Sequence, residues 1–520
     1  MNVVVHLVQL YGKLQPRNAE PLGIELLAAV VKNEHPECNV RVSSLMASDD
    51  DSRLPSLIDN LDDSRVGVIG IAIPQGTYQL ALKLLDSLRA RGSSALVVLG
   101  HALPTYMPEV FLDRYPEAII VAGWAEDAFN KLISEVRLGS QHFDSVPNLV
   151  FRKGGQVVST STSPDVRMPK PVRLQPDRIF ARVEASRGCH YDACTFCTRP
   201  PRAFNASRWC RRSPEDVIAD VAELKRAGVT TFTFTDEDFV GSDLEGALAI
   251  AKRLQRIGGM HFSFSCRVSN VWAETDTPRE RSLRRDVFAA LREAGLSLLF
   301  LGVESFSDSQ LHRYGKGTTA ADNLQAIDVI QGLGVTMELG FILFDPFLSI
   351  DELRENIAAL ERTGHWQYVG NLLDRLRIQR GAPFEKLARS RGALTIFDAE
   401  TMETAYAFED PWVGDLANTC TGWHGMFADA YDAARNYVRS SVGTSELQFV
   451  RRYRQLAFRL LSEATRTYPR VDELSVIRTL FEDRARTILR QLQEEMLATQ
   501  SNEGLFALLE DCLGSVRKVY

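Results

Sequence analysis

"EASRGCHYDACTFCTRPPR", residues 184–202, places three of the chain's eight cysteines within nine positions. Cys189, Cys194 and Cys197 follow a C-x4-C-x2-C spacing, directly after a run of β-forming residues. Such clustered cysteines are used in disulfide-bonded loops, in structural zinc sites and in iron–sulfur clusters. A cluster with only three thiolate ligands would also leave one iron open for a small molecule. The rest of the chain has to decide among these sites.

The bulk composition is that of an ordinary globular protein. The 520 residues are 45% hydrophobic and 24% charged, with a net charge of −7, and suggest about three domains. No long basic run predicts a nucleic-acid partner, and no apolar run approaches the roughly 18 residues of a membrane span. The first residues do not resemble an export signal, so we expect a cytoplasmic protein. In a reducing compartment, clustered thiols favour metal binding or catalysis over disulfides.

The first part of the chain, residues 1–140, alternates short runs rich in Val, Ile and Leu with amphipathic helical segments. This rhythm predicts a parallel sheet covered by helices on both faces, in a doubly wound, flavodoxin-like domain. Ligands of such domains bind beyond the carboxyl ends of the strands. That crevice would be lined by the loops at residues 10–20, 74–78, 100–108 and 123–126.

A connector over residues 141–178, with one hairpin at 148–160, precedes a second α/β alternation over 179–400. Six strand-and-helix units in series predict a partial (β/α)6 barrel, whose chemistry lies at the carboxyl ends of its strands. The predicted strands are at residues 179–187, 231–239, 261–269, 297–305, 336–346 and 372–380. Residues 401–520 have an amphipathic helical pattern.

Three ligand interpretations of the cysteine triplet stay open on spacing alone. A zinc site would need a fourth ligand, which Cys210 could supply. A plant-type 2Fe–2S electron carrier uses this C-x4-C-x2-C spacing with a distant fourth cysteine. A 4Fe–4S cluster on three cysteines leaves one iron open. An electron carrier of that kind, however, has no use for six strand-and-helix units around its cysteine loop.

With its context, the triplet resembles the signature of the radical S-adenosylmethionine (SAM) enzymes, a three-cysteine loop after the first strand of a partial barrel. The usual spacing is C-x3-C-x2-C, and this chain has one extra residue in the first gap. Three further stretches are similar to the motifs of the second, fourth and fifth strands of that superfamily. They are "TFTFTDEDFVG" (231–241), "LGVESFSDSQLHRYGKGTTAADNLQAI" (301–327) and "GFILFDPFLSIDELREN" (340–356).

The resemblance implies a 4Fe–4S cluster bound by Cys189, Cys194 and Cys197, with SAM chelating the open iron. An electron from the cluster would cleave SAM to a 5′-deoxyadenosyl radical, which abstracts hydrogen from the substrate. The residues expected to contact SAM are Phe196, Asp236, Asp238, Ser265, Arg267 and Glu304.

Each of these side chains has a specific expected role and, in several cases, an ordinary alternative. Phe196 would pack near the adenine, or simply on the barrel mouth. Asp236 and Asp238 would pair with the amino group, or cap the following helix. Arg267 would hold the carboxylate, or form a surface salt bridge. Ser265 would reach a cofactor hydroxyl, and Glu304 would bind the ribose or the amino group.

A doubly wound domain ahead of such a core resembles the cobalamin-binding class of these enzymes. The matching stretches are residues 20–31, 70–82, 97–111 and 121–129, although the D-x-H-x-x-G motif with its axial histidine is absent. His101 is the candidate axial ligand, with a hydrogen-bonding loop residue as the alternative. Gly76, Thr77, Gly100 and Gly123 would allow a flat macrocycle to approach, or serve tight turns only.

The resulting functional hypothesis is a cobalamin-dependent radical SAM enzyme that methylates an unactivated carbon of a small molecule or natural-product intermediate. A radical rearrangement or cyclisation is the alternative within the class, and a non-catalytic electron carrier or zinc protein is the alternative outside it. A reductant such as flavodoxin or ferredoxin is the expected protein partner.

Overall fold

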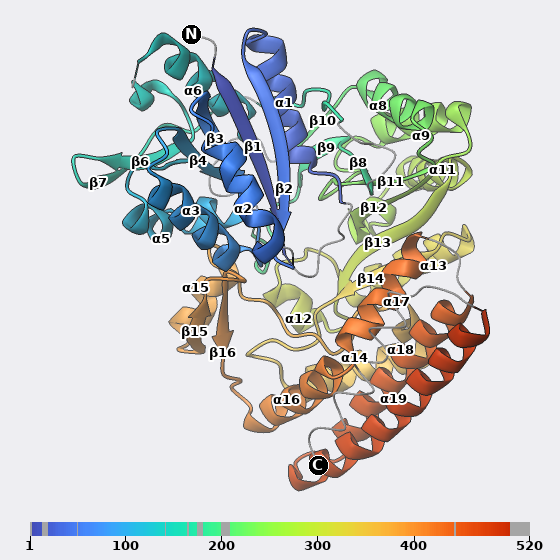
Figure 1. Cartoon of the computed structure of the whole chain (residues 1–520). Coiled ribbons are helices and arrows are strands. Elements are labelled where there is room, and N and C mark those ends of the chain that lie inside the picture. The colour runs from blue at the N-terminus through green and yellow to red at the C-terminus, as the bar shows by residue number, and fades with distance from the viewer. Residues whose placement is uncertain are drawn as a thin grey trace.

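The computed structural model describes residues 3–12, 19–48, 50–140, 142–163, 166–173, 180–198, 209–440 and 444–499. Its first domain contains a parallel sheet with the strand order β2-β1-β3-β4-β5 (Figure 1). This is the flavodoxin-like order, and it confirms the predicted doubly wound fold. The strands are β1 (Val4–Tyr11), β2 (Asn39–Met46), β3 (Val66–Ala72), β4 (Leu96–Gly100) and β5 (Ile119–Val121).

Helices pack on both faces of this sheet because its strands are apolar on both sides. The helices α1 (Leu22–Glu34) and α6 (Glu126–Leu138) form one core cluster with the sheet. The other face is covered by α2 (Asp50–Leu61), α3 (Tyr78–Arg91), α4 (Ala102–Tyr106) and α5 (Pro108–Arg114). The predicted hairpin forms as β6 (Leu149–Lys153) and β7 (Gln156–Ser159), and it extends the sheet through antiparallel pairing of β5 with β6.

The second domain contains a parallel sheet in the order β14-β13-β12-β11-β8. Its strands are β8 (Ala181–Val183), β11 (Thr231–Phe234), β12 (His261–Arg267), β13 (Leu296–Glu304) and β14 (Met337–Phe341). One face packs against α8 (Pro214–Arg226), α9 (Leu244–Ile257), α11 (Pro278–Glu293), α13 (Ala320–Gly332) and α14 (Ile350–Thr363). Shorter helices, α10 (Val268–Val271) and α12 (Asp308–Arg313), follow the carboxyl ends of β12 and β13.

The sixth predicted strand, at residues 372–380, does not form in the sheet. The segment makes two isolated bridges, a parallel one between Phe344 and Arg375 and an antiparallel one between Gln379 and Glu403. Just before the segment, Val369 makes one more isolated parallel bridge to Leu339 of β14. Glu338 on β14 forms ion pairs with Arg435 and Arg454 of the C-terminal helices at 2.6 and 3.2 Å. These buried ion pairs fix the C-terminal helices to β14.

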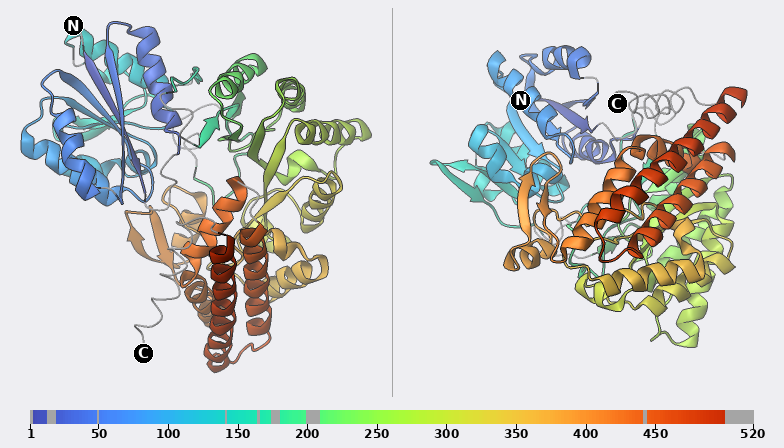
Figure 2. Two further views of the ribbon diagram at one scale, coloured as in Figure 1. Left: turned by 45° about the vertical axis from the view of Figure 1, so that its right-hand side comes forward. Right: turned by 90° about the horizontal axis from the view of Figure 1, so that it is seen from below.

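From Pro411 the C-terminal region is helical as predicted, with α16 (Pro411–Gly425), α17 (Ala428–Ser440), α18 (Thr444–Thr465) and α19 (Asp472–Thr499). The start of the range predicted to be helical, residues 401–520, instead contains a strand at residues 403–406, and its end, residues 500–520, lies outside the described residues. The C-terminal helices share one core cluster with the second domain. Before them, α15 (Pro383–Ser390) and the hairpin β15 (Leu394–Asp398) and β16 (Glu403–Tyr406) reach back to the first domain (Figure 2). Among the described helices, none is long and apolar enough to cross a membrane.

Candidate functional site

The cysteine loop starts from a short antiparallel pair at the carboxyl end of β8, formed by β9 (Ser186–Gly188) and β10 (Trp209–Arg211). All three cysteines line one cavity of about 90 Å³ at the carboxyl ends of the barrel strands. Most of the side chains expected from the sequence line the same cavity: Phe196, Ser265, Arg267 and Glu304. Lys316 and Glu237, which sequence reasoning missed, line it as well.

The loop is fixed by hydrogen bonds to the turn that follows α12. The backbone N–H of Thr195 donates to the carbonyl of Tyr314 at 2.8 Å, and the Thr195 hydroxyl donates to the carbonyl of Arg313 at 2.9 Å. Gly315 has φ +61°, and a Cβ there would lie 2.7 Å from the carbonyl oxygen of Ala193. Only glycine lets the turn approach the cysteine loop this closely.

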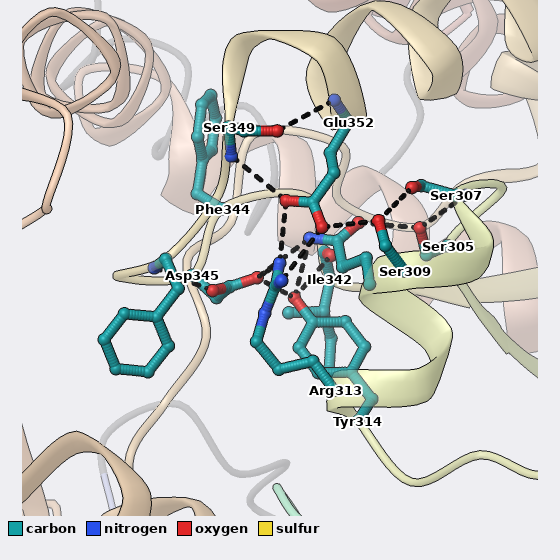
Figure 3. A network of polar contacts seen from close by, with 12 residues as sticks. Ser305, Ser307, Ser309, Arg313, Tyr314, Ile342, Phe344, Asp345, Ser349 and Glu352 are labelled. Atoms are coloured by element: carbon teal, nitrogen blue, oxygen red, sulfur yellow. Dashed lines mark hydrogen bonds and ion pairs between the residues drawn. The ribbon is translucent and has the colours of Figure 1, made fainter. Parts of the chain in front are cut away.

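The turn after α12 is itself fixed by a buried network of polar side chains (Figure 3). Arg313 donates to Asp345 at 2.8 Å and to both carboxylate oxygens of Glu352 at 2.9 Å. The Tyr314 hydroxyl donates to the same oxygen of Asp345 at 2.9 Å. Although desolvation opposes it, bonding to these carboxylates raises the pKa of Arg313. The cysteine loop therefore rests on a support whose own side chains are locked.

The donor set fits a cluster held by three thiolates better than a single metal ion. Within the described residues, no three His, Cys, Asp or Glu side chains converge on one metal position. Cys210, the fourth ligand that a zinc site would need, lies opposite Arg187 in the β9–β10 pair and does not line the cavity. Desolvation raises the pKa of the Cys194 thiol, whereas the charges of Lys316 and Arg267 oppose this rise.

Glu304 and Lys316 form a buried pair beside the cysteines. The Lys316 ammonium lies 3.5 Å from the Glu304 carboxylate, and the two residues are 3% and 9% exposed, lysine first. Glu304 has φ +69°, a costly conformation for a side chain other than glycine and one that clusters at functional sites. In the sequence, the glycines on both sides of Lys316 are the signal that could have identified this lysine as a site residue.

Arg267 is buried rather than part of a surface salt bridge. Its guanidinium donates to the carbonyl of Lys316 at 2.8 Å and stacks 3.7 Å above the ring of Tyr191. Among the described residues, its Nε–H has no hydrogen-bond partner, although Arg267 is only 7% exposed. The cavity thus presents two cations, Arg267 and Lys316, and three carboxylates, Asp192, Glu237 and Glu304. Groups of both charges fit the zwitterionic end of an amino acid.

Asp236 and Asp238 are not among the residues that line this cavity, whereas Glu237 between them is, and Asp238 accepts from the Cys189 thiol at 3.9 Å. Asp236 accepts hydrogen bonds from the backbone N–H of Ala185, at 3.1 Å, and from the hydroxyl of Ser186. Burial raises the pKa of Asp236 to about 7. Asp238 accepts from Asn270 at 2.9 Å and contacts His190 Nδ1 at 2.9 Å. Both acids therefore bind protein groups around the loop.

A second cavity, of about 360 Å³, lies in the crevice between the two domains. Gly100, His101 and Gly123 line it at the ends of β4 and β5, as predicted. It continues as a slot between the sheet and α1 and α6, where a Cβ on Gly70 would lie 2.7 Å from the Leu7 side chain. A wide opening with an apolar slot beneath it fits a flat macrocycle that carries an appended group.

Gly76 and Thr77 do not line this crevice. The Gly76 N–H donates to the carbonyl of Glu400 at 2.7 Å, and the Thr77 hydroxyl donates to the carbonyl of Pro74 at 2.7 Å. The Glu400 carboxylate also accepts from the backbone N–H of Gln79 at 2.9 Å. The tip of the β15–β16 hairpin covers the turn that was expected to face the macrocycle.

His101 is exposed to the crevice, but its hydrogen bonding opposes a ligand role. Its Nδ1 accepts from the backbone N–H of Ala102 at 2.8 Å, which places the proton of a neutral ring on Nε2. Desolvation within the crevice lowers the pKa of His101 to about 4, and the charge of Arg182 contributes a smaller part of this shift. Coordination through Nε2 would require that proton to move and the Ala102 bond to break.

The two cavities meet at Glu237. This residue is the one that they share among their described lining residues. Its Oε2 accepts from the backbone N–H of Gly188 at 2.9 Å, directly before Cys189. The carboxylate therefore borders both the cysteine cavity and the interdomain crevice.

Comparison with known proteins agrees with this geometry. The family model of the radical SAM superfamily matches residues 183–360, and that of the B12 binding domain matches residues 16–133. A curated relative, 4'-phospho-dehydrooxetanocin synthase of Priestia megaterium, is 30% identical over 335 residues. The match covers 59% of this chain and 44% of that protein, so the chain spans less than half of the relative's length.

Solved structures share the fold over nearly the whole chain. OxsB, a cobalamin-dependent SAM radical enzyme with aqua-cobalamin and SAM bound, superposes with a TM-score of 0.85 at 21% identity, covering 99% of this chain and 83% of its own. TsrM of Kitasatospora setae, a radical SAM methyltransferase, superposes with a TM-score of 0.64 at 14% identity, covering 89% and 98%. The chain therefore belongs to the radical SAM superfamily and carries the B12-binding domain of its cobalamin-binding class.

Proposed function

We propose that this protein is a cobalamin-dependent radical SAM enzyme that methylates an unactivated carbon of a small molecule. The observation that carries this proposal is the junction at Glu237, where the cysteine cavity meets the interdomain crevice. A carbon that exchanges hydrogen with one cofactor and a methyl group with the other has to reach both. A shared wall between the two cavities meets that geometric requirement.

The three cofactors implied by the two domains are a 4Fe–4S cluster, SAM and cobalamin. The reduced cluster would supply the electron that cleaves SAM, and cobalamin would supply the methyl group. Cys189, Cys194 and Cys197 would hold the cluster. In the crevice, Gly100 and Gly123 would border the corrin ring, and His101 would contact it through Nε2–H without binding the metal.

The cavity side chains would position SAM. Glu304 and Glu237 would accept from its ammonium group, and Lys316 and the free Nε–H of Arg267 would bind its carboxylate. Phe196, whose ring packs edge-on against Tyr314 at 5.7 Å between centroids, would flank the adenine. Ser265 would donate to a cofactor hydroxyl.

A radical rearrangement is the second candidate, and one comparison favours it. The 30%-identical relative is named a synthase rather than a methylase. Either reaction needs one-electron reduction of the cluster, for which we expect a flavodoxin or ferredoxin as the partner.

Anaerobic reconstitution tests the proposal. We expect about four irons per chain, a bound corrinoid in the visible spectrum, and 5′-deoxyadenosine when the loaded protein receives SAM and a reductant. With SAM labelled in its methyl group, methyl transfer predicts label in the product, whereas a rearrangement predicts none. A metal centre that never cleaves SAM would contradict both candidates.

A further inference from the structure

The open face of two central barrel strands carries a row of hydroxyl groups. Along β11 the side chains alternate between exposed and buried, so that Thr231 and Thr233 are exposed and Phe232 and Phe234 are buried. Thr235 continues the exposed side beyond the end of the strand. β11 lies between β8 and β12, so this exposure does not come from a sheet edge. The face of the sheet opposite the helices therefore borders an open barrel interior.

The next strand has the same arrangement. On β12 the phenylalanines Phe262 and Phe264 belong to the core beneath the helices, whereas Ser263 and Ser265 are only half-buried. Thr233 is in register with Ser263, and their hydroxyl oxygens are 2.9 Å apart. We call the following residues the hydroxyl row: Thr231, Thr233, Thr235 and Ser263. Ser265, which is assigned to SAM above, follows Ser263 on the same side of β12.

The hydroxyl row leads to the proposed reaction site. Thr235 lines the interdomain crevice, and Ser265 lines the cysteine cavity. Both lie next to the junction at Glu237. The bond between Thr233 and Ser263 uses one hydroxyl hydrogen, so the pair keeps a second hydrogen and oxygen lone pairs for a ligand.

An apolar substrate would fit this surface badly. A lipid or other hydrocarbon that filled the space would remove water from the hydroxyl groups without replacing its hydrogen bonds. Each polar group left without a partner costs about 1–3 kcal/mol. A substrate rich in hydroxyl groups would replace those bonds, and sites of this kind reject analogues that cannot form them.

We infer that the substrate is a water-soluble, polyhydroxylated molecule, such as a sugar derivative, bound along the hydroxyl row with its reacting carbon at the Glu237 junction. This inference rests on the proposed function, because it names the substrate class of the same site. The hydroxyl row selects the substrate, whereas the chemistry belongs to the cofactors.

The test uses hydrogen transfer to identify the solubility class of the substrate. Cells of the source organism are grown in deuterated medium, extracted, and partitioned into an aqueous methanol phase and a chloroform phase. Each phase is given to the loaded wild-type enzyme with SAM and reductant. Endogenous SAM, which is deuterated itself, is first removed from the aqueous phase. Carbon-bound deuterium survives the work-up, so a single deuterium in 5′-deoxyadenosine formed from the added unlabelled SAM reports abstraction from a molecule of that phase.

We expect deuterium from the aqueous phase and none from the chloroform phase. The double variant Thr233→Val/Ser263→Ala keeps the side-chain volume and should lower deuterium transfer at least tenfold. The single variants Thr233→Val and Ser263→Ala are measured beside it, in case the double variant does not fold. Iron and corrinoid content verify that each variant is loaded.

Thr336→Val is the matched control, because Thr336 is exposed at the start of β14, outside the hydroxyl row. It should transfer deuterium as the wild type does. Deuterium from the chloroform phase, or full transfer by the hydroxyl-row variants, would overturn the inference and leave the proposed function standing. SAM cleavage without deuterium from either phase would overturn the proposed function, and this inference with it.

Discussion

The guanidinium of Arg187 binds both carboxylate oxygens of Glu126, at 2.8 and 2.6 Å. Arg187 lies two residues before the first cysteine of the loop, and Glu126 is the first residue of α6 in the B12-binding domain. The Arg187 Nε–H also donates to Glu184 at 2.6 Å. Although desolvation opposes it, these carboxylates raise the pKa of Arg187. The two domains are thus joined at the base of the cysteine loop.

Glu126→Ala should destabilise the protein by about 3 kcal/mol, because Arg187 would stay buried with only one of its carboxylate partners. The measurement is the urea midpoint of the anaerobic protein, with corrinoid retention after gel filtration as a second readout. Arg389→Ala is the control. It removes an exposed ion pair with Glu385 within one helix, and it should cost less than about 1 kcal/mol. Equal effects of the two substitutions would contradict a structural role for the Arg187–Glu126 pair.

The sequence predicted both sheets because buried strands and amphipathic helices leave strong periodic patterns. It also predicted the cysteine loop, which follows a strand, and Glu304, which ends one. It did not reveal which acid of Asp236, Glu237 and Asp238 lines the cavity. That depends on where β11 ends and how the chain turns after Phe234, and propensities do not determine either to one residue.

The sequence also could not predict contacts between segments that lie far apart along the chain. Gly76 and Thr77 resemble ligand-binding turns, and only the fold brings Glu400, more than 300 residues later, onto them. The strand expected at residues 372–380 was wrong for a related reason. Its apolar positions suit a strand, but the segment bridges to Phe344 only at Arg375, and at Gln379 it pairs with Glu403 of the distant hairpin instead.

Lys316→Met should weaken SAM binding by about ten- to a hundredfold, because the substitution removes a carboxylate partner and leaves Glu304 unpaired in a buried site. Iron content should not change, since Lys316 is not a thiolate ligand. The measurement is SAM titration of the reduced cluster by electron paramagnetic resonance. Lys316→Arg should restore part of the affinity.

Lys386→Met is the matched control, because Lys386 is exposed on α15. It should bind SAM as the wild type does. If Lys316→Met bound SAM equally well, the carboxylate would have to be held elsewhere.

Cys210→Ser should leave about four irons per chain and unchanged SAM cleavage, because Cys210 lies in the β9–β10 pair outside the cysteine cavity. Cys197→Ser, by contrast, removes one of the three expected ligands and should abolish both. Iron and sulfide analysis after anaerobic reconstitution separates the two variants. Loss of the cluster in Cys210→Ser would point to a closed, four-cysteine centre without a position for SAM.

His101→Ala should keep corrinoid binding within about tenfold of the wild type, because Nδ1 bonds to Ala102 and Nε2 carries a proton. The cobalt electron paramagnetic resonance signal of the wild-type protein should show no splitting from a histidine nitrogen. Splitting that disappears in His101→Ala would establish axial coordination and contradict this prediction.

Asp236→Asn should become more stable relative to the wild type as the pH rises. Burial raises the pKa of Asp236 to about 7, against an ordinary value of 3.8. Between these values the folded wild type holds a proton that the unfolded chain releases. Its contribution to stability is therefore complete at low pH and is lost as the pH rises through about 7. The neutral amide of asparagine has no such dependence.

Between about pH 5.5 and pH 8, the difference in unfolding free energy should therefore shift by about 2 kcal/mol in favour of Asp236→Asn. Urea denaturation of both proteins across this range gives the difference directly, and Asp286→Asn, at an exposed position on α11, is the matched control. A difference that stayed constant with pH would mean that Asp236 ionises normally. The bond from the Ser186 hydroxyl would then be made to a charged carboxylate at the root of the cysteine loop.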